Sequence, residues 1–143
     1  MNHDRYSDDY LREILTGAKT IAVIGASPRP QRPSHGVMRY LQRHGYRTIP
    51  VNPFAAGDTI LGETCVAALA DIGEPVDMVD VFRRSEAAGD AVDQAIAIGA
   101  KAVWMQLGVR DDAAAARAEA AGLKVVMNRC PAIEIPRLEL ATR

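Results

Sequence analysis

Short apolar segments alternate with longer segments of helical character along the chain. The apolar runs predict five buried strands, at residues 20–24, 47–51, 76–82, 102–105 and 124–127. The apolar spacing, the Ser and Asp residues at the starts and the Gly residues at the ends predict helices at residues 7–17, 34–44, 63–70, 85–98 and 111–121. Residues 57–62 are predicted to form a loop, and the chain after Pro131 a short tail.

This alternation of strands and helices predicts the fold class. Parallel strands are joined by right-handed helical crossovers, which cover both faces of the sheet. We therefore expect an α/β, three-layer Rossmann-like fold with a five-stranded parallel sheet in the order 3-2-1-4-5, numbered along the chain. The 143 residues suit one domain, so residues 1–143 are expected to form a single domain, with the helix in residues 1–18 packed on it.

The composition narrows the class of protein. Hydrophobic residues make up 48% and charged residues 24%, which is typical of a globular chain. No apolar run approaches the roughly 18 residues of a membrane span, and the polar first residues argue against a secretory signal. Cys65 and Cys130 lie far apart and form neither a zinc motif nor a disulfide framework. We expect a cytoplasmic protein that does not interact with membranes.

The net charge of −1 hides an uneven distribution of charge. Residues 14–57 contain no Asp or Glu, but they contain Lys19, Arg29, Arg32, Arg39, Arg43 and Arg47. This segment is either a solvated basic surface or a local positive field that receives an anion. Nucleic acid is not the expected partner, because the chain is slightly acidic overall and its basic residues are not interleaved with stacking aromatics.

The loop after the first strand carries the most informative chemistry. In parallel α/β sheets, ligands bind beyond the carboxyl ends of the strands. Gly25 permits a sharp turn there, and the helix that begins near Ser34 offers free N–H groups and a partial positive charge to phosphate. Arg29 and Arg32 add guanidinium groups that pair with phosphate oxygens.

This loop lacks the two common nucleotide-binding motifs. GxGxxG would require glycines at Ser27 and Pro30, and the Gly-Lys pair of GxxxxGK[ST] is absent. Asn52 ends the second strand, where NAD-binding proteins carry an acid, and Pro53 beside it can form a wall for a flat ring. These departures count against NAD.

The remaining strand ends place further polar residues at the same edge of the sheet. Phe82, Arg83 and Arg84 follow the third strand, Gln106 and Gly108 the fourth, and Cys130 the fifth. In the expected strand order, the loops after the first and fourth strands flank the ligand crevice. No Ser-His-Asp set, Cys-His set or carboxylate pair stands at these ends, so we expect a binding site without catalytic groups.

Five blocks of the chain, at residues 21–34, 45–53, 60–62, 76–84 and 103–108, resemble in order the motifs of the CoA-binding domain family. Its members are small stand-alone proteins similar to the N-terminal domain of the succinyl-CoA synthetase alpha subunit. The resemblance covers about residues 20–138 and implies a Rossmann-like fold that binds coenzyme A. The synthetases carry their phosphorylated histidine in a second domain, which this chain lacks.

The resemblance also implies roles for individual residues. The first loop would hold the CoA phosphates through Gly25, Ala26, Ser27, Arg29, Arg32, Pro33 and Ser34. Asn52 and Pro53 would flank the nucleotide, Phe82, Arg83 and Arg84 would lie near the adenosine, and Gln106 and Gly108 would border the crevice.

We therefore expect a non-catalytic protein that binds CoA or an acyl-CoA as a carrier, sensor or regulator. Such a role is compatible with a protein partner, which the sequence does not identify. Three alternatives stay open: an NAD(P)-binding redox-regulatory module, an enzyme that uses Cys130, and an interaction module stabilised by CoA. Cys130 itself has two interpretations. It is either a small buried apolar residue, or a thiolate that the neighbouring Arg129 favours and that forms a mixed disulfide with CoA.

Overall fold

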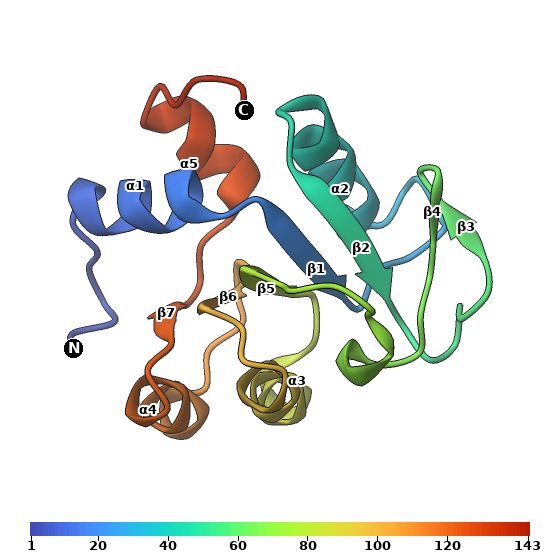
Figure 1. The fold of residues 1–143 in the computed structure, drawn as a ribbon. Helices are drawn as coiled ribbons and strands as arrows, with labels where there is room; N and C mark the ends of the chain where they lie inside the picture. Colours follow the sequence, from blue (N-terminus) through green and yellow to red (C-terminus); the bar gives the residue numbers. More distant parts are fainter.

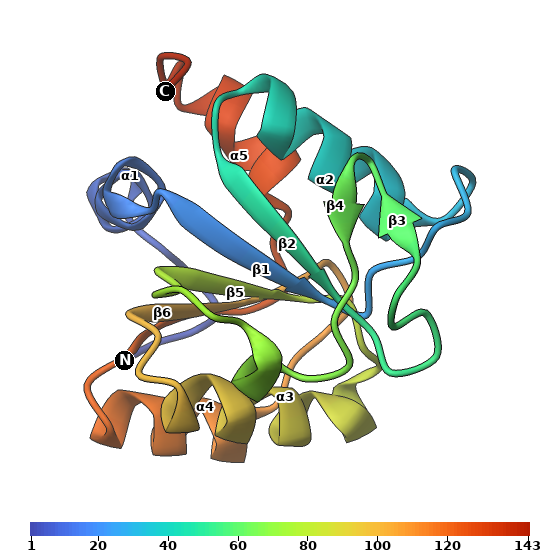
Figure 2. The same ribbon diagram turned by 45° about the vertical axis from the view of Figure 1, so that its right-hand side comes forward.

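The computed structural model describes residues 1–143 and arranges them in three layers (Figures 1 and 2). The central parallel sheet consists of β1 (Thr20–Ile24), β2 (Arg47–Val51), β5 (Met78–Val81), β6 (Ala102–Met105) and β7 (Lys124–Val126). One face is covered by α1 (Asp8–Gly17), α2 (Pro33–Arg43) and α5 (Pro131–Arg137), and the other by α3 (Ser85–Ala97) and α4 (Asp112–Ala120). The expected α/β class and five-stranded parallel sheet are confirmed.

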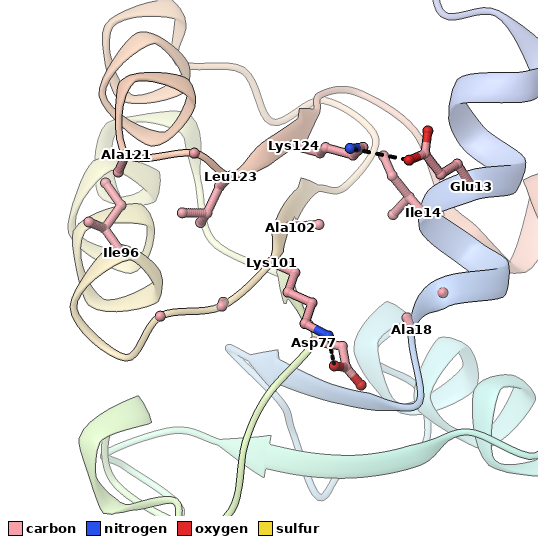
Figure 3. A pocket seen from close by; sticks show the side chains of 14 residues that line it. Glu13, Ile14, Ala18, Asp77, Ile96, Lys101, Ala102, Ala121, Leu123 and Lys124 are labelled. Carbon is pink, nitrogen blue, oxygen red and sulfur yellow. Dashed lines mark ion pairs between the residues drawn. The ribbon is translucent and has the colours of Figure 1, made fainter.

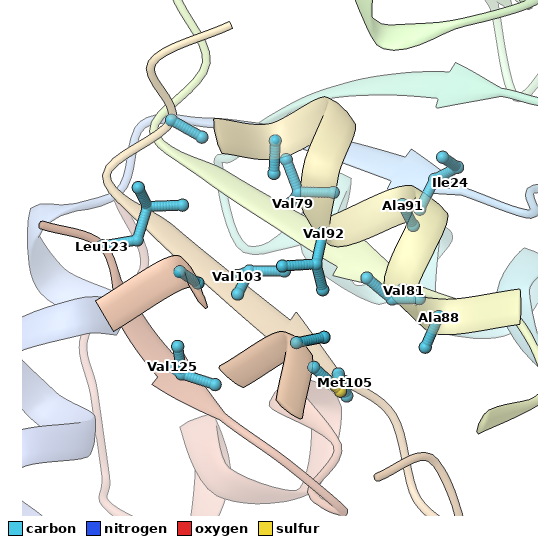
Figure 4. Close-up of a cluster of buried hydrophobic side chains, with 14 of the residues drawn as sticks. Ile24, Val79, Val81, Ala88, Ala91, Val92, Val103, Met105, Leu123 and Val125 are labelled. Carbon is cyan, nitrogen blue, oxygen red and sulfur yellow. The ribbon is translucent and has the colours of Figure 1, made fainter. Parts of the chain in front are cut away.

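Two hydrophobic cores lie on opposite faces of the sheet. Figure 4 shows the one under α3 and α4, where Val79, Val103 and Val125 of three adjacent strands pack beneath the helices. Ala91 and Val92 of α3 are fully buried against these strands. The small alanines let the helix backbone approach the sheet closely, which explains how a chain with few aromatics fills its core.

The strand order differs from the expected one. The observed order is β2-β1-β5-β6-β7, which is 2-1-3-4-5 when the five long strands are numbered along the chain; the predicted 3-2-1-4-5 was wrong. Pro50 in β2 explains why β2 does not lie between two strands, because proline has no N–H for a second ladder. The point where the strand order reverses therefore lies between β1 and β5, not between β1 and β6.

The segment after β2 folds differently from the prediction. Instead of a helix at residues 63–70, it forms the hairpin β3 (Thr59–Ile60) and β4 (Glu63–Thr64), followed by the single 3₁₀ turn η1 (Leu69–Asp71). Leu61 and Gly62 have φ of 49° and 83°, which suits a two-residue hairpin turn. Val66 then bonds to the outer edge of β2, donating to the carbonyl of Pro50 at 3.1 Å and accepting from Asn52 at 2.9 Å.

The C-terminal segment is helical where a tail was expected. Pro131 occupies the first position of α5, where its fixed φ and missing N–H cost nothing. Ile135 and Leu138 are buried in the core on the α2 side of the sheet. This helix completes the layer that stands over Trp104, which is fully buried and donates its indole N–H to the carbonyl of Arg129 at 2.9 Å.

Two tyrosines cover the open edge of β7. The Tyr10 hydroxyl donates to the carbonyl of Val125 at 2.9 Å and accepts from the N–H of the same residue at 3.0 Å. The Tyr6 hydroxyl accepts from the N–H of Met127 at 2.8 Å. These bonds satisfy backbone groups that would otherwise be open to pairing with another chain.

No helix is long and apolar enough to cross a membrane.

Candidate functional site

A crevice of about 790 Å³ opens at the carboxyl ends of the strands, beside the point where the strand order reverses. Its size is within the usual range of small-molecule sites. Most of the residues singled out from the sequence line it: Gly25, Ser27, Arg32, Pro33, Ser34, Asn52, Phe82, Arg83, Arg84, Gln106, Gly108 and Cys130. The loops after β1 and β5 flank it, and the loop after β6 also contributes to its lining.

Three of the residues singled out do not line the crevice. Ala26 is buried behind it, and Arg29 and Pro53 are exposed on the loops outside it. The sequence reasoning missed three apolar lining residues, namely Val37, Leu107 and Val109. Val37 stands one helical turn after Ser34, and this spacing could have identified it.

The loop after β1 is held in place by its own hydrogen bonds. The Ser34 hydroxyl accepts from the N–H of Ser27 at 3.1 Å, and the Ser27 hydroxyl accepts from the N–H of Arg29 at 3.1 Å. Asn52 ties this loop to the end of β2, donating to the carbonyl of Ala26 at 2.8 Å and accepting from the N–H of Phe54 at 3.0 Å. The amide of Asn52 is therefore used within the protein, although the residue lines the crevice.

Gly25 brings the loop after β1 against the start of the loop after β5. Its φ is 88°, and a Cβ at this position would stand 2.0 Å from the carbonyl oxygen of Phe82. Both the left-handed backbone and the close approach require glycine. The contact fixes the separation of the two loops that flank the crevice.

The crevice carries excess positive charge. Arg32, Arg83 and Arg84 line it, and no Asp or Glu does. All ion pairs of the protein involve other residues, so these three guanidinium groups have no carboxylate partner. A concave surface that carries positive charges and no negative ones attracts an anionic ligand.

The helices that begin at the crevice lack side-chain caps. The N-cap residues of α2 and α3 are Arg32 and Arg84, and neither makes a side-chain capping bond. Ser85 was expected to cap α3; it is instead the first residue of that helix, and its hydroxyl bonds to the loop after β6. In contrast, Ser7 and Asp111 cap α1 and α4. Uncapped N–H groups and the positive end of the helix dipole bind anions.

A second hollow of about 510 Å³ lies at the opposite, amino-terminal ends of the strands (Figure 3). Its cations are paired: Lys101 Nζ lies 3.6 Å from Asp77 Oδ1, and Lys124 Nζ lies 3.3 Å from Glu13 Oε1. Burial alone would raise the pKa of Asp77, but backbone N–H groups and Lys101 lower it overall. This hollow therefore offers no unpaired cation to an anionic ligand.

Cys130 stands at the inner wall of the crevice and is only 6% exposed. The guanidinium of Arg129, next to it in sequence, lies 5.2 Å from the ring centroid of Tyr6 and donates to the carbonyls of Asn128 and Asp4. The cation is therefore engaged with the N-terminal segment.

No cluster of His, Cys, Asp and Glu suited to a metal ion is present.

A parallel sheet with a basic crevice at the point where the strand order reverses defines a Rossmann-like α/β protein built to bind an anionic ligand. The family model described as the CoA binding domain matches residues 19–136, and the chain belongs to this family.

Several proteins are similar over nearly their whole length. The YneT protein of Bacillus subtilis (strain 168) is 39% identical over 120 residues, which cover 84% of this chain and 87% of YneT. A structure from Thermus thermophilus superposes with a TM-score of 0.88 at 44% identity, covering 93% of this chain and 99% of that one. A protein of Pyrococcus horikoshii OT3 superposes with a TM-score of 0.90 at 41% identity, covering 97% and 96%.

Proposed function

We propose that this protein binds coenzyme A or an acyl-CoA in the crevice and acts in the cytoplasm as a carrier, sensor or regulator without catalysing a reaction. The observation that carries the proposal is the acid-free crevice, in which Arg32, Arg83 and Arg84 stand unpaired beside two uncapped helix starts. CoA carries a pyrophosphate and a ribose 3′-phosphate, and guanidinium forks and helix N-termini suit both groups. Membership of the CoA-binding domain family supports the same ligand.

The NAD(P) alternative has less support. At the end of β2, dinucleotide-binding proteins use an acid to hold the ribose hydroxyls. In this protein Asn52 stands there, and its amide already forms hydrogen bonds with the backbone of Ala26 and Phe54. The loop after β1 also lacks the glycines that let a backbone approach the NAD pyrophosphate.

Calorimetric and thermal-shift titrations with CoA, acetyl-CoA, NAD and NADP test the proposal. A ligand that binds only the folded state adds about 2.7 kcal/mol of stability at a hundredfold excess over its Kd. We expect CoA or acetyl-CoA to raise the melting temperature and NAD to leave it unchanged. Equal shifts from CoA and NAD, or no binding of CoA and acetyl-CoA, would refute the proposal.

Arginine variants show whether the ligand occupies this crevice. Arg32→Ala or Arg83→Ala should each weaken CoA binding by about 1–3 kcal/mol, the range for losing a charge-assisted bond. The matched control is Arg39→Ala, because Arg39 is an exposed arginine of α2 outside the crevice. Equal losses in all three variants would show that general charge, and not this site, attracts the ligand.

A further inference from the structure

A carboxyl group and an amide meet beneath the floor of the crevice. Asp80 lies on β5 between Val23 of β1 and Trp104 of β6; none of its surface is exposed, and it takes part in no ion pair. Gln106 comes two residues after Trp104, so its side chain leaves the same face of the sheet. Gln106 lines the crevice and is only 7% exposed, so it stands between the crevice and the buried carboxyl group.

Contact with Asp80 orients the amide of Gln106. The NH₂ group lies 2.8 Å from Asp80 Oδ1 and 3.1 Å from Oδ2. In either protonation state of the carboxyl group, at least one of these oxygens carries no proton, so an amide oxygen in this place would face an acceptor. The NH₂ group satisfies the buried carboxyl group instead, and the amide oxygen, Gln106 Oε1, is turned to the crevice.

The charges on the crevice side favour the same orientation. Arg32, Arg83 and Arg84 line the crevice without a carboxylate partner, so its electrostatic field is positive. Side-chain amide dipoles orient in the field of the protein, and the oxygen is the negative end of the dipole. The carboxyl group behind the amide and the guanidinium groups in front of it therefore act in the same direction.

Gln106 Oε1 is an acceptor without a partner in the protein, because the side-chain hydrogen bonds of Gln106 are the two to Asp80. A polar group this deeply buried normally has a partner, so an unpaired oxygen at a ligand crevice points to a donor on the ligand. Phosphate groups present acceptor oxygens to guanidinium and N–H groups. A fully ionised phosphate has no donor for Gln106 Oε1, so this oxygen requires a different part of the ligand.

We propose that Gln106, with its amide held by Asp80, turns Oε1 to the bound ligand and accepts a hydrogen bond from an N–H group outside the phosphates. This inference rests on the proposed binding of CoA. CoA offers such donors in the amino group of adenine and in the amides of the pantetheine arm. Gln106 is therefore a specificity-determining residue that recognises a donor, Asp80 is the residue that positions it, and the arginines recognise the phosphates.

Calorimetric affinities for three ligands test the bond and identify the donor. They are CoA, 3′-phosphoadenosine 5′-diphosphate, which lacks the pantetheine arm, and deaminated CoA, in which a carbonyl oxygen replaces the amino group of adenine. Gln106→Met keeps a side chain of similar length without the acceptor, so CoA should bind about three- to tenfold more weakly, the usual net effect of one hydrogen bond.

The pattern of loss in Gln106→Met distinguishes the two donors. If adenine is the donor, CoA and 3′-phosphoadenosine 5′-diphosphate lose affinity equally and deaminated CoA loses none. If the arm is the donor, CoA and deaminated CoA lose affinity equally and 3′-phosphoadenosine 5′-diphosphate loses none. Either pattern supports the inference. The control Gln42→Met, in α2 outside the crevice, should leave all three affinities unchanged.

Variants of Asp80 separate positioning from folding. Gln106→Met leaves a buried carboxyl group unpaired, so the double variant Asp80→Val/Gln106→Met, with no polar group at either place, is measured beside it. It should show the same dependence on the ligand and no larger loss than Gln106→Met, because both lack the same bond to the ligand. Asp80→Val alone frees the amide of Gln106 to turn, so CoA should bind about two- to threefold more weakly.

Four results would overturn the inference while the proposed function stands. They are unchanged CoA affinity in both Gln106→Met and the double variant, equal losses for all three ligands, a larger loss in the double variant than in Gln106→Met, and wild-type affinity in Asp80→Val. Equal losses would show a contact with the shared phosphates or a general distortion of the crevice. Failure of the wild-type protein to bind CoA or acetyl-CoA would overturn both the inference and the proposed function.

Discussion

Replacing Gly25 by alanine tests how the two loops beside the crevice are held together. The new Cβ would lie 2.0 Å from the carbonyl oxygen of Phe82, far inside contact distance, on a backbone with φ of 88°. Left-handed backbone costs a residue with a Cβ about 1–2 kcal/mol, and forcing extra atoms into a packed region costs about 1–3 kcal/mol more. We therefore expect Gly25→Ala to lower the free energy of unfolding by about 2–5 kcal/mol and to weaken ligand binding.

Gly99→Ala is the matched control, because Gly99 has φ of 71° but nothing lies within 4 Å of its missing Cβ. It should lose only the backbone contribution, about 1–2 kcal/mol. Urea unfolding with an unchanged m-value measures both losses, and the melting temperature should fall by roughly 2–4 °C for each kcal/mol in a chain of this size. Equal losses in the two variants would refute the argument that close approach to Phe82 requires glycine.

Three further predictions concern single side chains. Because burial raises the pKa of Asp80, wild-type stability should fall as pH rises above the ordinary 3.8 and through the folded-state pKa. Asp80→Asn has no carboxyl group to ionise, so its free energy of unfolding should not fall in this pH range. Measured by urea unfolding, the difference in unfolding free energy between this variant and wild type should grow by up to about 1.4 kcal/mol for each pH unit across the range. A difference that does not change with pH would contradict the argument. Tyr10→Phe should lower the free energy of unfolding by about 1–3 kcal/mol, because it leaves backbone groups of β7 unpaired. The control Tyr40→Phe removes no hydrogen bond within the protein and should lower it less. Hydrogen exchange of the β7 amides measures the difference between the two variants. Incubation with CoA disulfide should release one CoA thiol and leave a mixed disulfide on Cys130, which lines the crevice, and not on Cys65; peptide mapping that finds no adduct, or equal adducts, would exclude it.

The strand positions could be predicted because each buried parallel strand is a contiguous apolar run, whereas their order could not be predicted from such runs. An apolar run shows that a strand is covered on both faces, but it does not identify the neighbouring strands. Pro50 was the available signal, since a residue without an N–H indicates an edge strand. It excludes the order 3-2-1-4-5, in which the second strand lies between two others. In the observed order β1 lies beside β5, which places the Phe82–Arg84 loop directly at the crevice.

Two short elements escaped prediction because tertiary contacts form them. The hairpin β3–β4 has only two residues in each strand, and the segment that follows it bonds to the exposed edge of β2 through Val66. Helix α5 has seven residues, which is too few for a clear period, although Pro131 at its first position was a usable signal.

The rim of the crevice could be predicted, but its floor could not. Gly25, Arg32 and Arg83 follow strand ends, where parallel sheets bind ligands, so their place follows from the chain order. Asp80 lies inside a strand, where its pairing with Gln106 depends on the register of β5 against β6. The sequence shows two acids, Asp77 and Asp80, in the apolar run at residues 76–82, and only the sheet shows that the partner of Asp80 reaches the crevice.

The capping pattern links the stability of the fold to the crevice. A side-chain cap contributes about 0.5–2 kcal/mol to a helix, and α1 and α4 have such caps in Ser7 and Asp111. Helices α2 and α3 begin at the crevice without one. Pro33, the first residue of α2, has no N–H, so the N–H groups left for a ligand are those of Ser34 in α2 and of Ser85 and Glu86 in α3. An anion that bonds to these groups would supply the missing caps and neutralise the unpaired arginines in the same step. On the proposed function, CoA phosphates would therefore stabilise the N-terminal ends of two helices as well as filling the crevice.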